Sequence, residues 1–236
     1  MNYLFLLLLF SHAYAFFADN IKEITLNVTN SISIKGEIND ELASKFIHEL
    51  NQKNNKTGVY VYLDTNGGSV DAGNLIVDEI QKYELDCIAQ NAASMGFIIL
   101  QACKTRYITK YGTLMQHQMS YGIMNEKEKV DSYTSFITQI ADVLLEMQSN
   151  RINIDKQTLK EKTFNDWWLF GVNAIKENCA DELAYIKCTS ALTNKTYTED
   201  VGSYTYTYSK CPLVNKPIKK TKNNEKMNIE DILFVL

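Results

Sequence analysis

The chain has 236 residues, of which 45% are hydrophobic and 22% are charged, so it is long enough for one large domain with a sizeable core. A formal net charge of −4 gives no general case for nucleic-acid binding, and two prolines with ten glycines exclude a collagen-like or Pro/Gly-rich disordered chain. No spacing of cysteine and histidine resembles a zinc site, so we expect no metal.

The first 15 residues have the pattern of a secretory signal peptide. Residues 3–10 form a compact apolar run that is too short to span a bilayer, and Ala13-Tyr14-Ala15 has the small-x-small form of a cleavage site. No lysine or arginine precedes the run, and a retained membrane anchor or a buried strand is the alternative interpretation. Cleavage would start the mature chain near Phe16, on the secretory route to a lumenal, extracellular or membrane-tethered location.

The five cysteines fit an oxidising route only in part. Cys87 and Cys103 lie in apolar runs, and we expect each to be a buried free thiol. Cys179, Cys188 and Cys211 come later, and a bond between the last two could staple the C-terminal segment. Because five is an odd number, at least one thiol is free or intermolecular.

Apolar periodicity predicts alternating strands and helices over most of the chain. Strands are expected at 24–28, 31–36, 59–63, 87–89, 106–108 and 113–116. Helices are expected from an N-cap at Asn39 through Leu50, and at 69–83, 97–103, 126–151, 158–162 and 172–178. This alternation predicts parallel βαβ units, in which functional residues gather at the carboxyl ends of the strands. Gly68 and Ser94 both follow strands and should therefore lie at one edge of the sheet.

Two later segments have a different character. The helix expected at 126–151 carries more apolar residues than a surface helix needs, so it either packs in the core or projects against a neighbouring subunit. From about residue 184 the chain is rich in tyrosine and threonine and then becomes basic. We interpret the basic run as a solvated linker; it contains Lys216, Lys219, Lys220 and Lys222.

Ser94 occupies a position suited to a nucleophile. It lies between a strand-like and a helix-like run, and the small residues on both sides allow a tight turn that exposes its hydroxyl. The backbone N–H of Met95, at the helix N-terminus, can bind developing negative charge. A hydroxyl also needs a base, usually a histidine held by a carboxylate. His12 lies in the leader and His48 on the polar side of a helix, which leaves His117.

Five segments form a combination that is more specific than any one of them alone. They are Ser33-Ile-Lys-Gly-Glu-Ile-Asn-Asp40, Asp64-Thr-Asn-Gly-Gly-Ser-Val70, Ala92-Ala-Ser-Met-Gly96, Met115-Gln-His-Gln118 and Asp166-Trp-Trp-Leu with Ala174 and Asp181. In this order they resemble the ClpP peptidase family, the proteolytic subunit of Clp proteases in the crotonase-like superfamily. The resemblance covers about residues 31–183.

The resemblance implies a fold and a set of site residues. The fold would be the α/β, crotonase-like ClpP fold of repeated ββα units with a projecting long helix, in a domain at 16–188 followed by a tail at 189–236. Ser94 matches the family nucleophile, His117 the general base, and Asp166 the acid that holds the imidazole. Gly68 and Met95 match the two backbone donors of the oxyanion hole.

The resemblance also implies an activity and partners. The family hydrolyses peptide bonds in extended polypeptides without a metal or nucleotide cofactor of its own, so we expect a serine endopeptidase that forms an acyl-enzyme. A homo-oligomeric ring and an AAA+ unfoldase partner follow by family resemblance, with no nucleic acid. Thr65-Asn66 replaces the family's Ser-Pro, Met119 replaces a proline, and 120–124 replaces a glycine-rich segment that helps to join two rings. Ring size and stacking of two rings are therefore left open.

Three alternatives stand beside the endopeptidase interpretation. A catalytically inactive ClpP-like assembly or scaffold subunit should lack a triad member, and none is missing. A Ser–Lys protease like the signal-peptide peptidases would use Lys104 or Lys110, which lie in no matching motif. An acyl-CoA-handling crotonase relative needs no Ser–His–Asp set. Labelling of an activated serine would separate these classes.

Overall fold

The computed structural model describes residues 21–223, which divide into two compact units. The first unit comprises Thr29–Lys187 and the described residues up to Ile24. The second comprises Thr25–Val28 and the chain from Cys188 onward. The leader predicted at 1–15 lies outside the described residues. No helix in the described range has the length and apolar character needed to cross a membrane.

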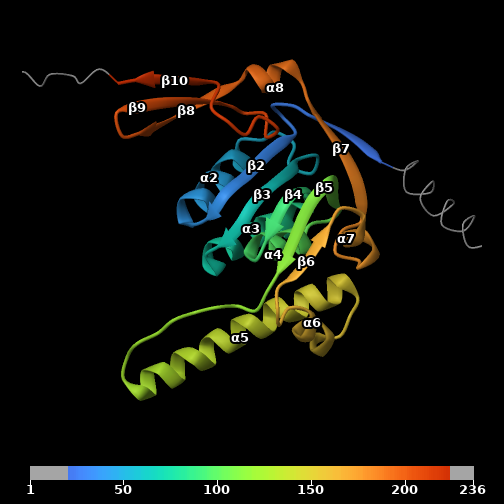
Figure 1. Ribbon diagram of the computed structural model, residues 1–236, viewed down its shortest axis with the longest axis vertical. Helices are drawn as coiled ribbons and strands as arrows, with labels where there is room; N and C mark the ends of the chain where they lie inside the picture. Colours follow the sequence, from blue (N-terminus) through green and yellow to red (C-terminus); the bar gives the residue numbers. More distant parts are fainter. Residues whose placement is uncertain (1–20, 224–236) are drawn as a thin grey trace, which may run out of the picture. The chain divides into compact units, whose positions relative to one another are not determined.

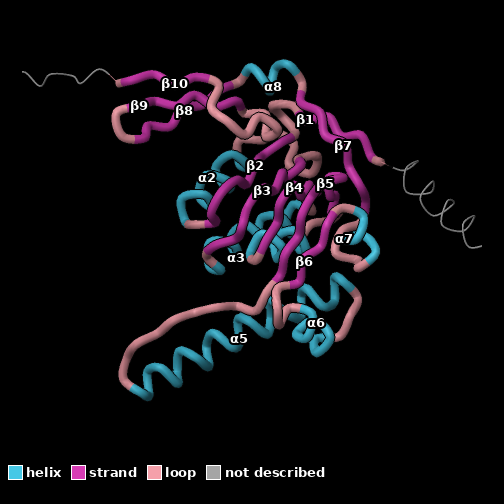
Figure 2. The backbone as a smooth tube through the Cα atoms, in the orientation of Figure 1, coloured by secondary structure: helices cyan, strands magenta, loops and turns pink. Residues whose placement is uncertain are grey.

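The first unit is built on a mostly parallel sheet, drawn in Figures 1 and 2. Its strands are β1 (Lys22–Leu26), β2 (Ser31–Ile38), β3 (Tyr60–Gly68), β4 (Asp86–Ala93), β5 (Arg106–Gln116), β6 (Trp167–Phe170) and β7 (Glu182–Cys188). Their order is β1-β7-β5-β4-β3-β2, with β6 pairing antiparallel to β5. The pairs from β2 to β5 and from β5 to β7 are parallel. The predicted α/β class is confirmed.

The helices form where the apolar spacing predicts them. They are α2 (Asp40–Asn51), α3 (Val70–Tyr83), α4 (Met95–Ala102), α5 (Lys127–Ile152), α6 (Lys156–Lys162) and α7 (Val172–Lys176). Asn39 caps α2 as predicted, since its side chain accepts a hydrogen bond from the N–H of Leu42 at 2.9 Å. The α3 helix packs against both α2 and α4, and α2 and α4 pack on the sheet.

One strand prediction is wrong. The separate strands expected at 106–108 and 113–116 are a single strand, β5, which pairs with β4 along both parts. The register shifts between Ala89 and Asn91, so the intervening residues of β5 are accommodated in a bulge.

The 26-residue helix α5 is the longest element of the first unit. Figure 1 shows it extending away from the sheet, with only its later part near the other helices. Its buried residues, Leu144, Gln148, Ser149 and Ile152, all lie toward its C-terminus. Earlier apolar residues such as Tyr133, Phe136 and Val143 are exposed. Of the two placements that the sequence left open, core packing therefore applies only to the last turns.

The second unit contains structure that the sequence analysis missed. A short helix, α8 (Ser190–Asn194), precedes an antiparallel sheet of β8 (Thr196–Val201), β9 (Tyr204–Ser209) and β10 (Lys219–Lys222). Lys219, Lys220 and Lys222 of the basic run predicted as a linker therefore lie in strand β10. Alternation along β9 puts Tyr204, Tyr206 and Tyr208 on one face, and Lys220 lies 3.9 Å from the ring centroid of Tyr204. The bond considered between Cys188 and Cys211 is present.

Candidate active site

Ser94 lies at the turn between β4 and α4. Its backbone has φ 54° and ψ −118°, a conformation that is rare for a residue with a side chain and typical of a sharp strand-to-helix turn at a functional site. Ser94 is the N-cap residue of α4, but its hydroxyl makes no capping hydrogen bond. By contrast, the Ser69 hydroxyl caps α3 by accepting from the N–H of Ala72 at 3.3 Å. The Ser94 hydroxyl is therefore available for another partner.

That partner is His117. Its Nε2 atom lies 2.8 Å from Ser94 Oγ, within hydrogen-bonding distance. His117 follows the last residue of β5, which pairs with β4, and the Ser94 N–H donates to the Met115 carbonyl at 2.9 Å. The parallel pairing of these two strands therefore sets the distance between serine and histidine. His48, the other described histidine, is exposed on α2 and bonded to Gln52.

Gly68 and Met95 line the same cavity as Ser94 and His117. Gly68 has φ 147°, and a Cβ there would lie 2.2 Å from the Ile38 carbonyl oxygen, so only glycine fits. Gly67, which also follows the predicted strand, packs directly behind the serine: a Cβ there would lie 2.7 Å from Ser94 Cβ. Gly67 therefore lets the β3 backbone approach the nucleophile closely, and Gly68 lets it approach the end of β2.

Thr65 holds this glycine segment in place. Its hydroxyl donates to the Gly36 carbonyl at 2.5 Å and accepts from the Gly67 N–H at 3.0 Å. The departure from the family's Ser-Pro at 65–66 thus retains a hydroxyl that organises the turn.

The backbone of Asp166 lies opposite that of His117, one residue beyond the pairing of β6 with β5. Strand β6 is antiparallel to β5, with Trp167 opposite Gln116, so the next pair of residues is Asp166 and His117. Asp166 has φ 49° and is exposed. Within the described residues, no hydrogen bond joins its carboxylate to the imidazole. Its role in orienting His117 stays a prediction.

Neither lysine of the Ser–Lys alternative lines the cavity around Ser94. Lys104 pairs with Glu84 at 3.1 Å, and Lys110 is exposed and lies over the ring of Tyr111. Both are therefore engaged away from the serine.

The cavity beside Ser94 has a volume of about 390 Å³ and is bounded on the far side by α5 and α6. Apolar side chains form most of its wall: Val70, Met95, Ile98, Met119, Leu144 and Leu145. Two buried amides, Gln116 and Gln148, also line it. Gln116 lies in the matched segment that contains His117, but the sequence analysis gave neither amide a role. The cavity is large enough to receive a side chain of a bound polypeptide.

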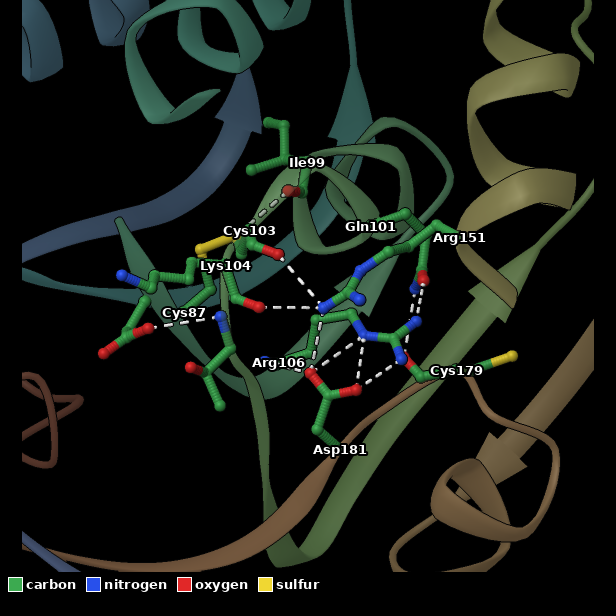
Figure 3. The surroundings of a disulfide bond; sticks show 11 residues. Cys87, Ile99, Gln101, Cys103, Lys104, Arg106, Arg151, Cys179 and Asp181 are labelled. Carbon is green, nitrogen blue, oxygen red and sulfur yellow. Dashed lines mark hydrogen bonds and ion pairs between the residues drawn. A yellow bond between two sulfur atoms is a disulfide. The ribbon is translucent and has the colours of Figure 1, made fainter. Parts of the chain in front are cut away.

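The prediction of free thiols at Cys87 and Cys103 is wrong. The two form a disulfide, with their Cα atoms 5.8 Å apart, as Figure 3 shows. Cys87 lies near the start of β4, and Cys103 directly follows α4. Because α4 runs back along β4, its end brings Cys103 next to Cys87. The closed loop contains Ser94. The described residues leave only Cys179 free, and burial raises the pKa of its thiol to about 12.

We expect this disulfide to stabilise the unit that carries the nucleophile. Replacing Cys87 and Cys103 together by alanine should lower the free energy of unfolding by about 3 kcal/mol, because the unfolded chain loses the constraint of a 16-residue loop. Urea denaturation with and without reductant would measure the loss. The matched control is the Cys188/Cys211 double replacement, in the other unit. An unchanged midpoint in the first variant would contradict the prediction.

A charged network lies next to the disulfide in Figure 3. Arg106, at the start of β5, is 1% exposed and contacts Asp181 with its backbone N–H at 2.8 Å and its guanidinium at 2.5 Å. It also donates to Gln101 of α4 at 2.6 Å, and Arg151 of α5 donates to Asp181 at 3.0 Å. The network therefore joins the three elements that carry Ser94, His117 and the cavity wall.

Comparison with known proteins identifies the family of the chain. A family model described as Clp protease matches residues 18–186. The "ATP-dependent Clp protease proteolytic subunit" of Borreliella afzelii (strain PKo) is 30% identical over 161 residues, which cover 64% of this chain and 81% of that protein. The protein of Borrelia garinii subsp. bavariensis with the same name is 31% identical over 161 residues and is covered to 82%. The chain belongs to the Clp protease family, and it is a peptidase by this membership.

Proposed function

We propose that this protein is a serine endopeptidase of the ClpP type, with Ser94 as nucleophile and His117 as general base. The observation that carries the proposal is the 2.8 Å contact between Ser94 Oγ and His117 Nε2, made by a serine whose hydroxyl makes no capping bond. A serine hydroxyl becomes a nucleophile when a base in hydrogen-bonding contact removes its proton.

The proposed reaction has two stages. His117 takes the Ser94 proton as Oγ attacks the peptide carbonyl, and the backbone N–H groups of Gly68 and Met95 bind the resulting oxyanion. His117 then gives that proton to the leaving amine, and an acyl-enzyme ester remains. His117 then takes a proton from a water molecule, which attacks the ester carbonyl. The bond to Ser94 Oγ breaks, the acyl group leaves as a carboxylic acid, and His117 returns the proton to Oγ. Asp166 would hold the imidazole and stabilise its charged form.

Assembly into a homo-oligomer is part of the proposal. Isolated exposed apolar residues are common, but Tyr133, Phe136 and Val143 lie on one extended helix with little of the unit packed against it. A second copy of the chain would cover this surface. Because the relatives are named as subunits of an ATP-dependent protease, we also propose an ATP-driven unfoldase as a partner.

We further propose that the protein works in an oxidising compartment. Two disulfides support this placement, since such bonds persist in secreted and lumenal proteins. A signal peptide at 1–15 with cleavage after Ala15 would supply the route.

The test is mass spectrometry of the assembled protein after treatment with a fluorophosphonate. We expect a covalent adduct on the peptide that contains Ser94, absent from the His117→Ala variant. The peptide containing Ser69 is the internal control, because that hydroxyl caps a helix and has no histidine partner in the structure. No adduct on folded protein would favour the inactive scaffold alternative. An adduct that persists without His117 would favour a different base.

A further inference from the structure

Two buried amides line the cavity beside Ser94, whose wall is mostly apolar. Gln116 precedes His117 at the end of β5, and Gln148 lies on α5; each is 4% exposed. A glutamine is rarely buried to this extent, and it costs free energy unless its hydrogen-bonding groups are satisfied. The hydrogen-bonding groups of the two amides that have no partner therefore indicate what the cavity can bind.

The amides bond to each other but retain unused capacity. Gln116 Nε2 donates to Gln148 Oε1, and Gln148 Nε2 donates to the Leu144 carbonyl at 2.9 Å. Gln116 Oε1 accepts from the His117 N–H at 3.2 Å. Each side chain can donate two hydrogen bonds and accept two. Among the described residues, these contacts leave one N–H and one acceptor position unused on each amide.

Most of the other polar residues that line the cavity are exposed or already paired. Gln118, Ser120, Tyr121 and Thr138 are exposed, and Ser94 and His117 contact each other. Thr163 is buried and already donates to the Leu159 carbonyl at 2.8 Å. Asp142 and Lys160 are each more than half exposed and lie 4.0 Å apart, so their opposite charges face solvent and each other. The amide pair therefore presents neutral donors and acceptors, and no net charge to balance a buried ion.

We propose that this cavity selects a carboxamide side chain, glutamine or asparagine, at the substrate residue whose carbonyl Ser94 attacks. The inference rests on the proposed endopeptidase function and names its substrate class. A carboxamide offers a carbonyl oxygen to the spare N–H groups and an NH2 to the spare acceptors. Leucine fills the apolar wall but leaves the amides unsatisfied, and a carboxylate would be buried without a counter-charge.

The experiment compares short peptide amides of aminomethylcoumarin that differ only in having glutamine, leucine or glutamate before the scissile bond. We expect kcat/KM for glutamine to exceed that for leucine on the order of tenfold, the worth of about one net hydrogen bond, with glutamate cleaved more slowly than glutamine. A higher value for leucine or glutamate would overturn the inference.

The variant Gln116→Leu/Gln148→Leu removes both amides at once, so that neither is left with an unpaired partner. We expect it to favour leucine over glutamine. The matched control is Gln157→Leu, an exposed glutamine on α6 outside the cavity, which should keep the glutamine preference. A purely structural role would lower both rates and leave their ratio unchanged, which would overturn the inference.

Two further outcomes separate the two proposals. Fluorophosphonate labelling of Ser94 together with a preference for leucine would retain the proposed function and overturn only the specificity. No labelling and no cleavage of any of the peptides by folded protein would overturn the proposed function and this inference with it. If the double variant fails to fold, the preference of the unaltered protein decides.

Discussion

The variants Ser94→Ala and His117→Ala should each lose peptidase activity on the order of 10⁴-fold or more, while the fold stays intact. The two groups act as one unit across a 2.8 Å contact, so the double variant should lose no more activity than either single variant. The measurement is kcat/KM on a fluorogenic peptide, with thermal unfolding to verify the fold.

His48→Ala is the matched control for this prediction. His48 is exposed on α2 and bonded only to Gln52 among the described residues, so its loss should leave activity unchanged. Full activity in Ser94→Ala would refute the mechanism. Asp166→Asn isolates the third group: a loss approaching that of His117→Ala would support its orienting role, whereas normal activity would mean that another group holds the imidazole.

Asp181→Asn should lower the free energy of unfolding by about 3 kcal/mol, which is the largest effect on stability that we expect from a single replacement. The substitution keeps the shape of the side chain but leaves the buried guanidinium of Arg106 without its counter-charge. Removing one partner of a buried ion pair usually costs about 3–5 kcal/mol. We take the lower end of that range because the Asp181 side chain is 28% exposed. Chemical denaturation followed by circular dichroism would measure the change.

The matched control is Asp131→Asn. Asp131 pairs with Lys127 on the exposed face of α5, at 2.6 Å, and such surface pairs contribute about 0.5 kcal/mol or less. Equal effects of the two substitutions would contradict the assignment of a structural role to the Arg106 network.

The same network predicts a dependence of stability on pH. Burial alone raises the pKa of Asp181, but the hydrogen bonds and charge of Arg106 outweigh it and hold that pKa below its ordinary value. Asp181 therefore contributes its full stability above the unfolded-state pKa of about 3.9, and this contribution is lost as the pH falls through the lower folded-state value. The Asp181→Asn variant should show a weaker dependence on pH in this acidic range.

The sequence predicted local structure well where one element determines its own pattern. The apolar spacing of α2 and α3 and the N-cap at Asn39 are properties of neighbouring residues, and the structure confirms them. The tyrosine alternation in β9 was such a pattern too, but we interpreted its segment as a tail because its composition differs from that of the preceding chain. The bulge in β5 depends on the neighbouring strand β4, so the sequence of β5 alone suggested two strands.

The candidate site could be predicted in its parts but not in its surroundings. The order of Ser94, His117 and Asp166 within specific motifs was sufficient to select them. The Cys87–Cys103 bond could not be predicted, because it requires that α4 fold back along β4 by the right length. Gln116 and Gln148 are separated by 32 residues, and only Gln116 lies in a matched segment, where it was assigned no role. Only the folded chain brings their amides together.

The sequence by itself thus determined the α/β class, the family and the residues proposed for chemistry, because periodicity and motif order are local properties of the chain. The tertiary structure decided the distance between Ser94 and His117, the disulfide that closes the loop containing Ser94, the network at Arg106 and the pairing of the two amides in the cavity. Each of these depends on contacts between elements far apart in sequence, whose free energy comes from burial and pairing that exist only in the folded chain.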